Sequence, residues 1–498
     1  MTATHWTPGE AIHAHTEANP EEVAVSCALA DGGVARLTRS ELDRWSSRLA
    51  HRLLAMGVEP GRYVAIALPN GVEHIVATLA CYKAGGTPMP VSYRLPPAER
   101  DALLDLAAPA AVFSDEAGAG DLTRSTMAAS ALASYPDSLP AAGTPEPIKA
   151  VASGGSTGRP KLIVTPGPFA YPPGGHPLAA LLRLSPADLM YSPGPLYHNG
   201  PFLFSLVLLF QGGRILLNER FRADRALALI ESERPTVLNL VPTMMQRMLR
   251  EPGFAEAGLD SVRLLWHLAA PCPDWAKRGF IERLGGERVL ELWAATEMNG
   301  LTVIDGNEWL AHPGSVGRPV ATELRIVDEQ RRELPAGEVG EIFSRFAGGR
   351  AQYRYEGATP LEELDEGFSS VGDMGYLDEE GYLYLSDRRV DMIISGGANV
   401  FPAEVESVLS SHPKVQDVAV IGLADADLGR RVHAVVEPRD PADPPAVAEL
   451  DTLCREQLAA YKVPRGYEVV PELPRTEAGK IRRLALREAR DRLPDQAS

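Results

Sequence analysis

Cysteine is scarce in this sequence, and long apolar runs are absent. The four cysteines, Cys27, Cys81, Cys272 and Cys454, lie far apart and form no CxxC pair, which argues against a disulfide framework and a cysteine-based zinc site. The most apolar run, 202–210, is far shorter than the ~20 residues that cross a bilayer. The N-terminus lacks a charged start followed by an apolar core, so no signal peptide is expected. We therefore expect a cytoplasmic protein with no membrane span.

Basic residues are outnumbered and form no block. Lys and Arg total 49 against 66 Asp and Glu, a formal net charge of −17. Such a chain lacks the electrostatic attraction that dominates nucleic-acid binding, so no nucleic-acid partner is expected. The chain has 498 residues, of which 45% are hydrophobic and 23% charged, as is typical of a soluble globular protein with two or more domains. We interpret it as an enzyme.

Strand and helix patterns alternate through most of the chain. Apolar strand-like runs at 62–68, 110–113 and 213–217 are separated by helical patterns, and Thr38 with Glu41 forms a capping box. This alternation predicts parallel sheets covered on both faces. Short strands broken by turns follow from about residue 314, and a further α/β pattern follows residue 391, with a helix over 402–410. The predicted fold class is α/β: a large N-terminal body of parallel subdomains plus a small β-rich unit, then a small α+β C-terminal domain.

The stretch SGGSTGRPK, at 153–161, is the most informative in the sequence. Its glycines let backbone N–H groups approach an anion, while its hydroxyls and Lys161 add donors and charge. A P-loop is excluded because Pro160 precedes the lysine and a strand-like run follows it. A serine hydrolase with Ser156 as nucleophile stays open, as does a plain Gly/Ser turn. The candidate phosphate-binding residues are Ser153, Gly154, Gly155, Ser156, Thr157, Gly158 and Lys161.

Seven further motifs follow the loop along the chain. They are YHN at 197–199, WAATE at 293–297, GSVGRP at 314–319, Gly372-Asp373, Asp387-Arg388, SGGAN at 395–399 and PRTEAGK at 474–480. Together with SGGSTGRPK, this set resembles the ANL superfamily of adenylate-forming enzymes, which includes acyl-CoA synthetases, peptide-synthetase adenylation domains and luciferases. The segments 195–202 and 266–272 look most like acid–CoA ligases of the fatty-acid and bile-acid type.

The resemblance implies a two-step reaction and a two-domain organisation. A carboxylic acid attacks the α-phosphorus of Mg·ATP to give an acyl-adenylate and pyrophosphate, and the thiol of coenzyme A then displaces AMP. The implied domains are residues 1–387, which bind the nucleotide, a hinge at 388–391, and a mobile domain at 392–498. Lys480 is the implied catalytic residue, because a cation can bridge two anions that must meet. The implied cofactors are ATP, Mg²⁺ and, as co-substrate, coenzyme A.

The resemblance also gives roles to the remaining motif residues. Glu297 would hold Mg²⁺, which prefers carboxylate oxygen, and Thr296 would act beside it. Asp373 would accept the ribose hydroxyls, and Arg388 would contact the ribose or a phosphate. The other implied nucleotide contacts are Trp293, in place of the family's adenine-stacking tyrosine, and Ala295.

The acid-binding pocket is the least defined part of the expected site. His198 is expected in its wall rather than as a general base, because a carboxylate needs no deprotonation at neutral pH. Trp266, Ala269 and Ala270 are candidate lining residues, with core packing as the alternative. Val390 replaces the usual polar hinge residue, which leaves open an acceptor other than coenzyme A: an amine, a carrier-protein thiol, or activation of nitrite. The small-molecule carboxylic acid is unspecified, and monomer and homodimer both stay open.

Overall fold

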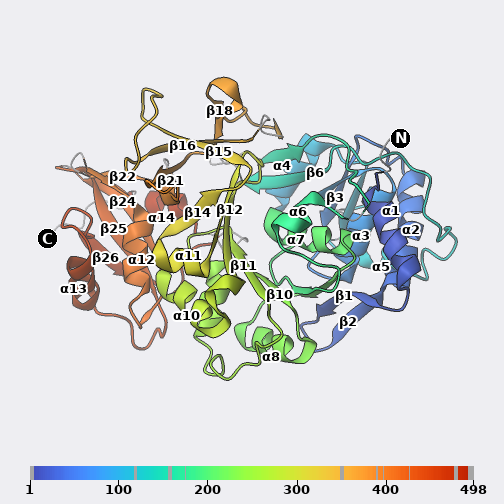
Figure 1. Cartoon of the computed structure of the whole chain (residues 1–498), viewed down its shortest axis with the longest axis horizontal. Helices are drawn as coiled ribbons and strands as arrows, with labels where there is room; N and C mark the ends of the chain where they lie inside the picture. Colours follow the sequence, from blue (N-terminus) through green and yellow to red (C-terminus); the bar gives the residue numbers. More distant parts are fainter. Residues whose placement is uncertain are drawn as a thin grey trace.

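The computed structural model describes residues 5–116, 120–154, 160–173, 175–347, 353–388, 391–395, 398–425, 427–475 and 481–491. A large N-terminal body and a smaller C-terminal unit lie at opposite ends of the long axis in Figure 1, where the chain runs from blue to red. The predicted fold class, a large α/β body followed by a small C-terminal domain, is confirmed.

One large sheet runs through the body, and its central strands are parallel. In the order β12–β11–β10–β8–β9–β1 every neighbouring pair is parallel. These strands are short apolar runs because helices cover both faces of this part of the sheet. The antiparallel β2 closes that end. The strands are β1 (Val23–Ala28), β2 (Val34–Thr38), β8 (Leu189–Tyr191), β9 (Arg214–Asn218), β10 (Val237–Leu240), β11 (Leu264–Leu268) and β12 (Val289–Ala294).

The predicted β-rich unit continues this sheet rather than forming a separate one. The chain turns back after β12, so that Trp293 lies opposite Thr302 and the next strand adds to the same edge in antiparallel orientation. The later strands extend that edge, also antiparallel. They are β13 (Leu301–Asp305), β14 (Ser315–Pro319), β15 (Thr322–Val327), β16 (Gly340–Phe346), β18 (Glu362–Glu363), β19 (Ser369–Ser370), β20 (Asp373–Leu377) and β21 (Leu383–Arg388).

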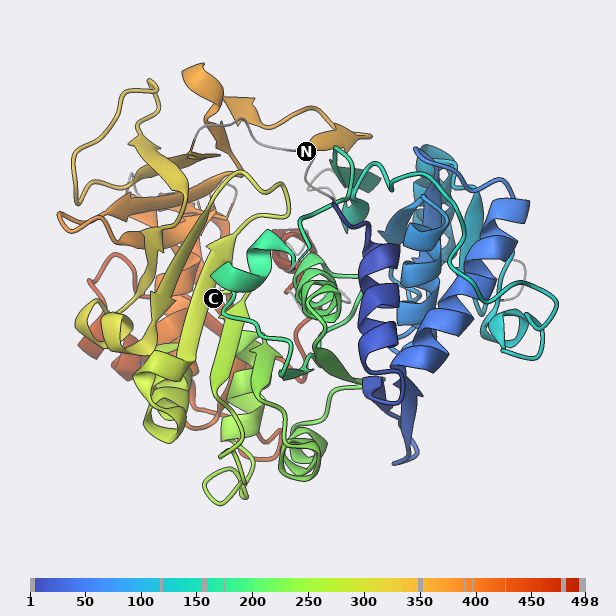
Figure 2. The ribbon, with the colours of Figure 1, turned by 45° about the vertical axis from the view of Figure 1, so that its right-hand side comes forward.

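The most apolar helix, α7 (Asn199–Phe210), lies inside the body. It packs between α1 and β9, and in Figure 2 a green helix separates the blue helices from the yellow-green strands. A helix apolar on all sides is stable only when it is buried. Within the described residues no helix is long and apolar enough to cross a membrane. The other helices of this part of the body are α1 (Pro8–Ala18), α6 (Pro177–Leu181), α8 (Ala223–Glu233), α9 (Pro242–Leu249), α10 (Asp274–Leu284), η1 (Gly286–Arg288) and α11 (Gly306–Ala311).

A smaller parallel sheet, in the order β4–β3–β5, packs beside α2 and α3 near the N-terminus. The predicted capping box opens α2: the Glu41 amide donates to the Thr38 hydroxyl at 3.2 Å, and the Thr38 amide donates to the Glu41 carboxylate at 2.9 Å. These bonds satisfy amide groups that the first turn leaves without partners. The elements are α2 (Arg39–Ala55), β3 (Tyr63–Ala67), α3 (Val72–Lys83), β4 (Thr87–Pro90), α4 (Pro97–Ala107), β5 (Ala111–Ser114) and α5 (Arg124–Met127).

The expected phosphate loop joins two antiparallel strands. Ser153 in β6 (Lys149–Gly154) lies opposite Lys161 in β7 (Pro160–Thr165), and β17 (Arg354–Glu356) pairs with the other edge of β7. A hydrolase nucleophile needs a sharp turn from a strand into a helix. A hairpin does not provide that turn, so the structure gives no support to the serine hydrolase alternative.

The C-terminal unit has its own sheet and core. Its long strands β24 and β25 are antiparallel, and β26 adds in parallel to β25. Helices α12, α13 and α14 cover the sheet, and the predicted helix over 402–410 is confirmed as α12. The elements are β22 (Ile393–Ser395), β23 (Ala398–Val400), α12 (Pro402–Ser410), β24 (Val415–Asp425), β25 (Gly429–Pro438), α13 (Val447–Gln457), β26 (Gly466–Val469) and α14 (Arg483–Asp491).

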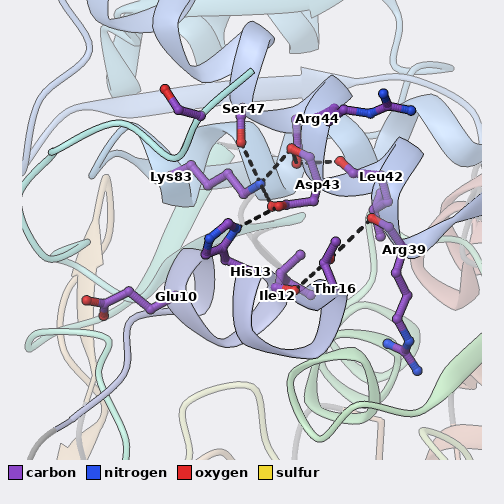
Figure 3. Close-up of polar contacts among 12 residues, drawn as sticks. Glu10, Ile12, His13, Thr16, Arg39, Leu42, Asp43, Arg44, Ser47 and Lys83 are labelled. Carbon is purple, nitrogen blue, oxygen red and sulfur yellow. Dashed lines mark hydrogen bonds and ion pairs between the residues drawn. The ribbon is translucent and has the colours of Figure 1, made fainter. Parts of the chain in front are cut away.

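A buried polar cluster ties the first three helices together (Figure 3). Lys83 of α3 forms an ion pair with Asp43 of α2, and its ammonium also donates to the Asp43 carbonyl at 2.8 Å and to the Ser47 hydroxyl at 2.9 Å. His13 of α1 contacts the second Asp43 oxygen at 2.9 Å. The Lys83 and Asp43 side chains are 0% and 7% exposed. Since a buried charge is tolerated only when it is paired, each residue depends on the other.

Candidate active site

The carboxyl ends of β11 and β12 lie side by side and carry several of the residues that the sequence singles out. The strands are parallel neighbours, with Leu268 opposite Leu292. Ala269 and Ala270 follow β11 and are exposed, and Ala269 has a left-handed φ of 78°. Such a backbone is strained for alanine, and strain of this kind gathers at functional sites. Ligands of open parallel sheets bind at this edge, so we take it as the candidate active site.

Trp293, at the end of β12, reaches across to β20. Its indole Nε1–H donates to Oδ2 of Asp373 at 2.9 Å. Asp373 lies opposite Arg388 in the pairing of β20 with β21, although the Arg388 side chain is outside the described part of the structure. Trp293 and Asp373, to which the resemblance gives nucleoside contacts, thus meet although they lie 80 positions apart. Ala295 and Thr296 follow Trp293 and are half-buried.

A carboxylate, a cation and a phenol meet beside the hairpin loop. Glu297 is 8% exposed, and its Oε1 accepts a hydrogen bond from the Tyr355 hydroxyl at 2.5 Å. The same oxygen lies 3.9 Å from Nζ of Lys161, and that ammonium stands over the Tyr355 ring, 4.1 Å from its centre. These three side chains come from the segment after β12, from β7 and from β17. Their position places both charges at the start of β7, the strand that follows residues 155–159 in the sequence.

A second lysine lies deeper in the same region. Lys149, at the start of β6, is 3% exposed and donates from Nζ to Oδ1 of Asn199. Burial lowers the pKa of Lys149 to about 8, an effect that the nearby Glu297 carboxylate partly opposes. Asn199 is the first residue of α7 and follows His198, which is half-buried with its ring 4.6 Å from that of Tyr197. Lys149 therefore joins the phosphate-loop hairpin to the segment expected to border the acid.

The residues at this edge fit a magnesium–nucleotide complex. Among the described residues no group of three or more His, Cys, Asp or Glu side chains gathers as a metal site. Mg²⁺ in nucleotide sites keeps several waters and is held by one or two carboxylates together with substrate phosphates. Glu297 supplies such a carboxylate, and Lys161 supplies positive charge for a phosphate. The flat Trp293 indole and the Asp373 carboxylate suit a base and a ribose.

The structure does not place every predicted site residue at this edge. Trp266 is fully buried in the core, where its indole N–H donates to the Leu182 carbonyl at 2.9 Å. This position matches the packing alternative, and a role for Trp266 in acid binding stays a prediction. Backbone positions alone are described for Ser153, Gly154 and Arg388. The predicted residues outside the described part of the chain are Gly155, Ser156, Thr157, Gly158 and Lys480, together with the hinge residue Val390.

Two residues of the site were missed by sequence reasoning. Tyr355 reaches the site only because β17 pairs with β7, so that Tyr355 lies opposite Ile163. No local motif marks that pairing. Lys149 had a detectable signal, because it is a lysine four residues before SGGSTGRPK at the start of a run that reads as a buried strand. A charge in such a run indicates either an edge or a functional site.

The Lys149 environment predicts a pH-dependent stability difference. Wild type should gain free energy of unfolding relative to Lys149→Met as the pH rises from about 7 to about 9.5. The folded-state pKa of Lys149 is about 8 against an ordinary 10.5, so in this window the unfolded chain holds a proton that the folded chain has lost. Stability rises with pH when the unfolded state binds more protons, and methionine removes this contribution. Urea unfolding of both proteins at the two pH values tests it; a constant difference would contradict the assignment.

Comparisons with known proteins identify the family. Residues 12–349 match the family described as AMP-binding enzyme, and residues 404–480 match the AMP-binding enzyme C-terminal domain. A feruloyl-CoA synthase from an Amycolatopsis species is 34% identical over 470 residues, covering 91% of this chain and 94% of that protein. The fatty acid–[acyl-carrier-protein] ligase ScoC of Streptomyces coeruleorubidus is 30% identical over 499 residues, covering 95% and 94%.

Solved structures agree with the sequence relatives. MatB from Rhodopseudomonas palustris with bound ATP superposes with a TM-score of 0.81 at 28% identity, covering 98% of this chain and 99% of that one. The apo form of MatB, with the same identity and coverage, superposes with a TM-score of 0.70. The prediction of an adenylate-forming, AMP-forming acid–CoA ligase is confirmed by these relationships. The chain belongs to the AMP-binding enzyme family.

Proposed function

We propose that this chain joins a carboxylic acid bearing an aromatic group to coenzyme A at the expense of Mg·ATP, in the cytoplasm. The observation that carries the proposal is the cluster of Lys161, Glu297 and Tyr355 at the start of β7. This cluster sets a cation and a metal-binding carboxylate beside a loop rich in glycine and hydroxyl groups. Phosphate recognition uses such a combination.

The nucleotide would lie across the sheet edge from Trp293 to the hairpin loop. Trp293 would stack on the adenine, with Ala295 beside it, and Asp373 would accept the ribose hydroxyls while the indole holds its carboxylate in place. Arg388 would contact the ribose or a phosphate from the opposite strand. The loop residues Ser153 to Gly158 and Lys161 would bind the phosphates. Glu297, with Thr296 beside it, would hold the magnesium ion, which supplies charge that neutralises phosphate oxygens.

The chemistry proceeds by two displacements. A carboxylate oxygen of the acid attacks the α-phosphorus of ATP, the bond to the β-phosphate oxygen breaks, and pyrophosphate leaves. The sulfur of coenzyme A, having lost its proton, then attacks the acyl carbon, and AMP leaves with the bonding electrons. Lys480 would bridge the carboxylate and the α-phosphate in the first step, where two anions must approach each other. Residues 1–387 and 392–498 would form the two domains, joined by the hinge at 388–391.

The acid side of the site favours a flat, aromatic substrate. Tyr197 and His198 stand together, and the Tyr93 ring lies 6.4 Å from that of Tyr197. Small, exposed side chains follow β11 at Ala269 and Ala270. Aromatic walls pair well with aromatic ligands. The relative with 34% identity is named as a feruloyl-CoA synthase, which supports the same substrate class and coenzyme A as acceptor.

The initial rate of thioester formation across a panel of acids tests this proposal. Ferulate, benzoate, palmitate and a steroidal acid would each be incubated with Mg·ATP and coenzyme A, and the acyl-CoA product quantified by mass spectrometry. The highest kcat/KM is expected with ferulate or benzoate. A clear preference for palmitate or the steroid would overturn the aromatic assignment. Formation of the adenylate without acyl-CoA would overturn the assignment of coenzyme A as acceptor. A carrier protein, an aryl amine and nitrite would then be tested in its place.

A further inference from the structure

One arginine of the N-terminal body binds the C-terminal unit through three hydrogen bonds. Arg250 follows α9, and its Nη1 donates to the carbonyl and to Oε1 of Gln416, each at 3.0 Å. Its Nη2 donates to the Val415 carbonyl at 3.1 Å. Val415 and Gln416 begin β24, an edge strand of the three-stranded sheet of the C-terminal unit and the strand that α12 and α14 contact. A guanidinium has fixed donor geometry, so these bonds define the orientation of β24 relative to α9.

The Arg250 side chain is itself held in place. Its guanidinium carbon lies 5.0 Å from the centre of the Trp275 ring, on α10 of the body. Stacking on an indole restricts the arginine without using its N–H donors. The donors are therefore already directed at β24, and the cost in side-chain entropy of forming the three bonds is reduced.

The same end of β24 is connected to the segment that contains Lys480. Asp417, next to Gln416, accepts a hydrogen bond from Nη2 of Arg475 at 2.7 Å. Arg475 pairs through its backbone with Ile481, and the Arg482 amide donates to the Pro474 carbonyl at 2.8 Å. Both flanks of residues 476–480 are thus fastened to each other and to β24. A contact that orients the start of β24 also orients these flanks.

We propose that Arg250 is a positioning residue for adenylation. By holding Gln416 and Val415, it keeps the C-terminal unit in the arrangement that serves the first step, in which Lys480 bridges two anions. Arg250 touches neither acid nor nucleotide and acts only through β24. The inference rests on the proposed function, because Lys480 receives its role there. Transfer of the acyl group to coenzyme A needs no bridging cation, so Arg250 is not required for the second step.

Separate measurement of the two half-reactions tests this. In Arg250→Met, acid-dependent ATP–pyrophosphate exchange should fall about tenfold in kcat, the effect of losing hydrogen bonds from a charged donor. The KM for ATP should stay the same, because the nucleotide contacts are untouched. Acyl-CoA formation from synthetic acyl-adenylate should keep the wild-type rate. Arg250→Lys should recover part of the exchange rate, since one ammonium can reach a β24 carbonyl.

Arg247 provides a matched control. It lies one turn earlier on α9, it is exposed, and among the described residues it forms no hydrogen bond with the C-terminal unit. Arg247→Met removes the same charge and should leave both half-reactions unchanged. Equal loss in both steps for Arg250→Met, or an unchanged exchange rate, would overturn the proposal.

A second variant tests the proposal if Arg250→Met fails to fold. Gln416→Ala removes one of the three hydrogen bonds and is expected to slow pyrophosphate exchange about two- to threefold. An unchanged exchange rate in Gln416→Ala would overturn the proposal. Failure of wild type to exchange pyrophosphate with any acid would instead refute the proposed function.

Discussion

Replacing Lys480 by alanine is expected to lower acid-dependent pyrophosphate release by about 10²–10³-fold, the loss seen when one preorganised electrostatic group is removed from a transition state. The carboxylate and the α-phosphate repel each other as they approach, and in the role proposed for Lys480 its ammonium would offset that repulsion only while they react. The effect should therefore appear in kcat, with little change in the KM for ATP. Rapid-quench measurement of acyl-adenylate formation in a single turnover checks it.

The second half-reaction gives the control for Lys480. Conversion of synthetic acyl-adenylate and coenzyme A into thioester should proceed in Lys480→Ala at close to the wild-type rate. Lys480→Arg keeps a positive charge on a differently shaped group and should be intermediate in adenylate formation. Loss of both half-reactions to the same extent would indicate that Lys480 supports the fold of the C-terminal unit. An unchanged first step would remove Lys480 from the mechanism.

Asp43→Asn is expected to lower the stability of the N-terminal body by about 3–5 kcal/mol, the cost of leaving a buried charge without its partner. The substitution keeps the shape of the side chain but removes the charge that pairs with Lys83 in the cluster of Figure 3. Burial already lowers the pKa of Lys83, and Asp43 counteracts that effect. Urea unfolding followed by tryptophan fluorescence measures the loss.

A double variant separates the pair from the packing around it. Asp43→Asn with Lys83→Met removes both charges, and most of the lost stability should return because an apolar side chain of similar length fills the same space. Ser47→Ala, which removes one hydrogen bond from the Lys83 ammonium, should cost only about 1 kcal/mol. If the double variant is no more stable than Asp43→Asn, the contacts of His13 and Ser47 with this cluster also require the two charges.

Local patterns in the sequence were enough to predict much of the fold. The capping box of Thr38 and Glu41 opens α2 as expected, because its hydrogen bonds act within a single helical turn, and α12 spans the predicted helix. Pro160 between the loop and the apolar run predicts a strand, and β7 starts there. The continuity of the β-rich unit with the large sheet was not predicted. It follows from the turn after β12, which makes β13 pair with β12 in antiparallel orientation. The sequence pattern indicates which residues form strands, but not which strands are neighbours in the sheet.

The candidate site could be predicted where a motif is continuous and not where distant strands meet. WAATE places Trp293 and Glu297 at the end of β12, as an apolar strand followed by polar residues indicates. The bond from Trp293 to Asp373 and the bond from Tyr355 to Glu297 join residues 80 and 58 positions apart. Such contacts depend on register between strands, which sequence spacing does not encode. Tyr355 was missed for this reason, whereas Lys149 carried a local signal in the strand-like run before the loop.

The most direct test of the central claim is pyrophosphate release from Mg·ATP by the full chain, measured with and without an aromatic acid and with and without coenzyme A. The account predicts that release requires the acid, that it stops near one equivalent per enzyme without coenzyme A, and that coenzyme A restores turnover. Pyrophosphate release that does not depend on the acid, or no release with any acid, would contradict the account.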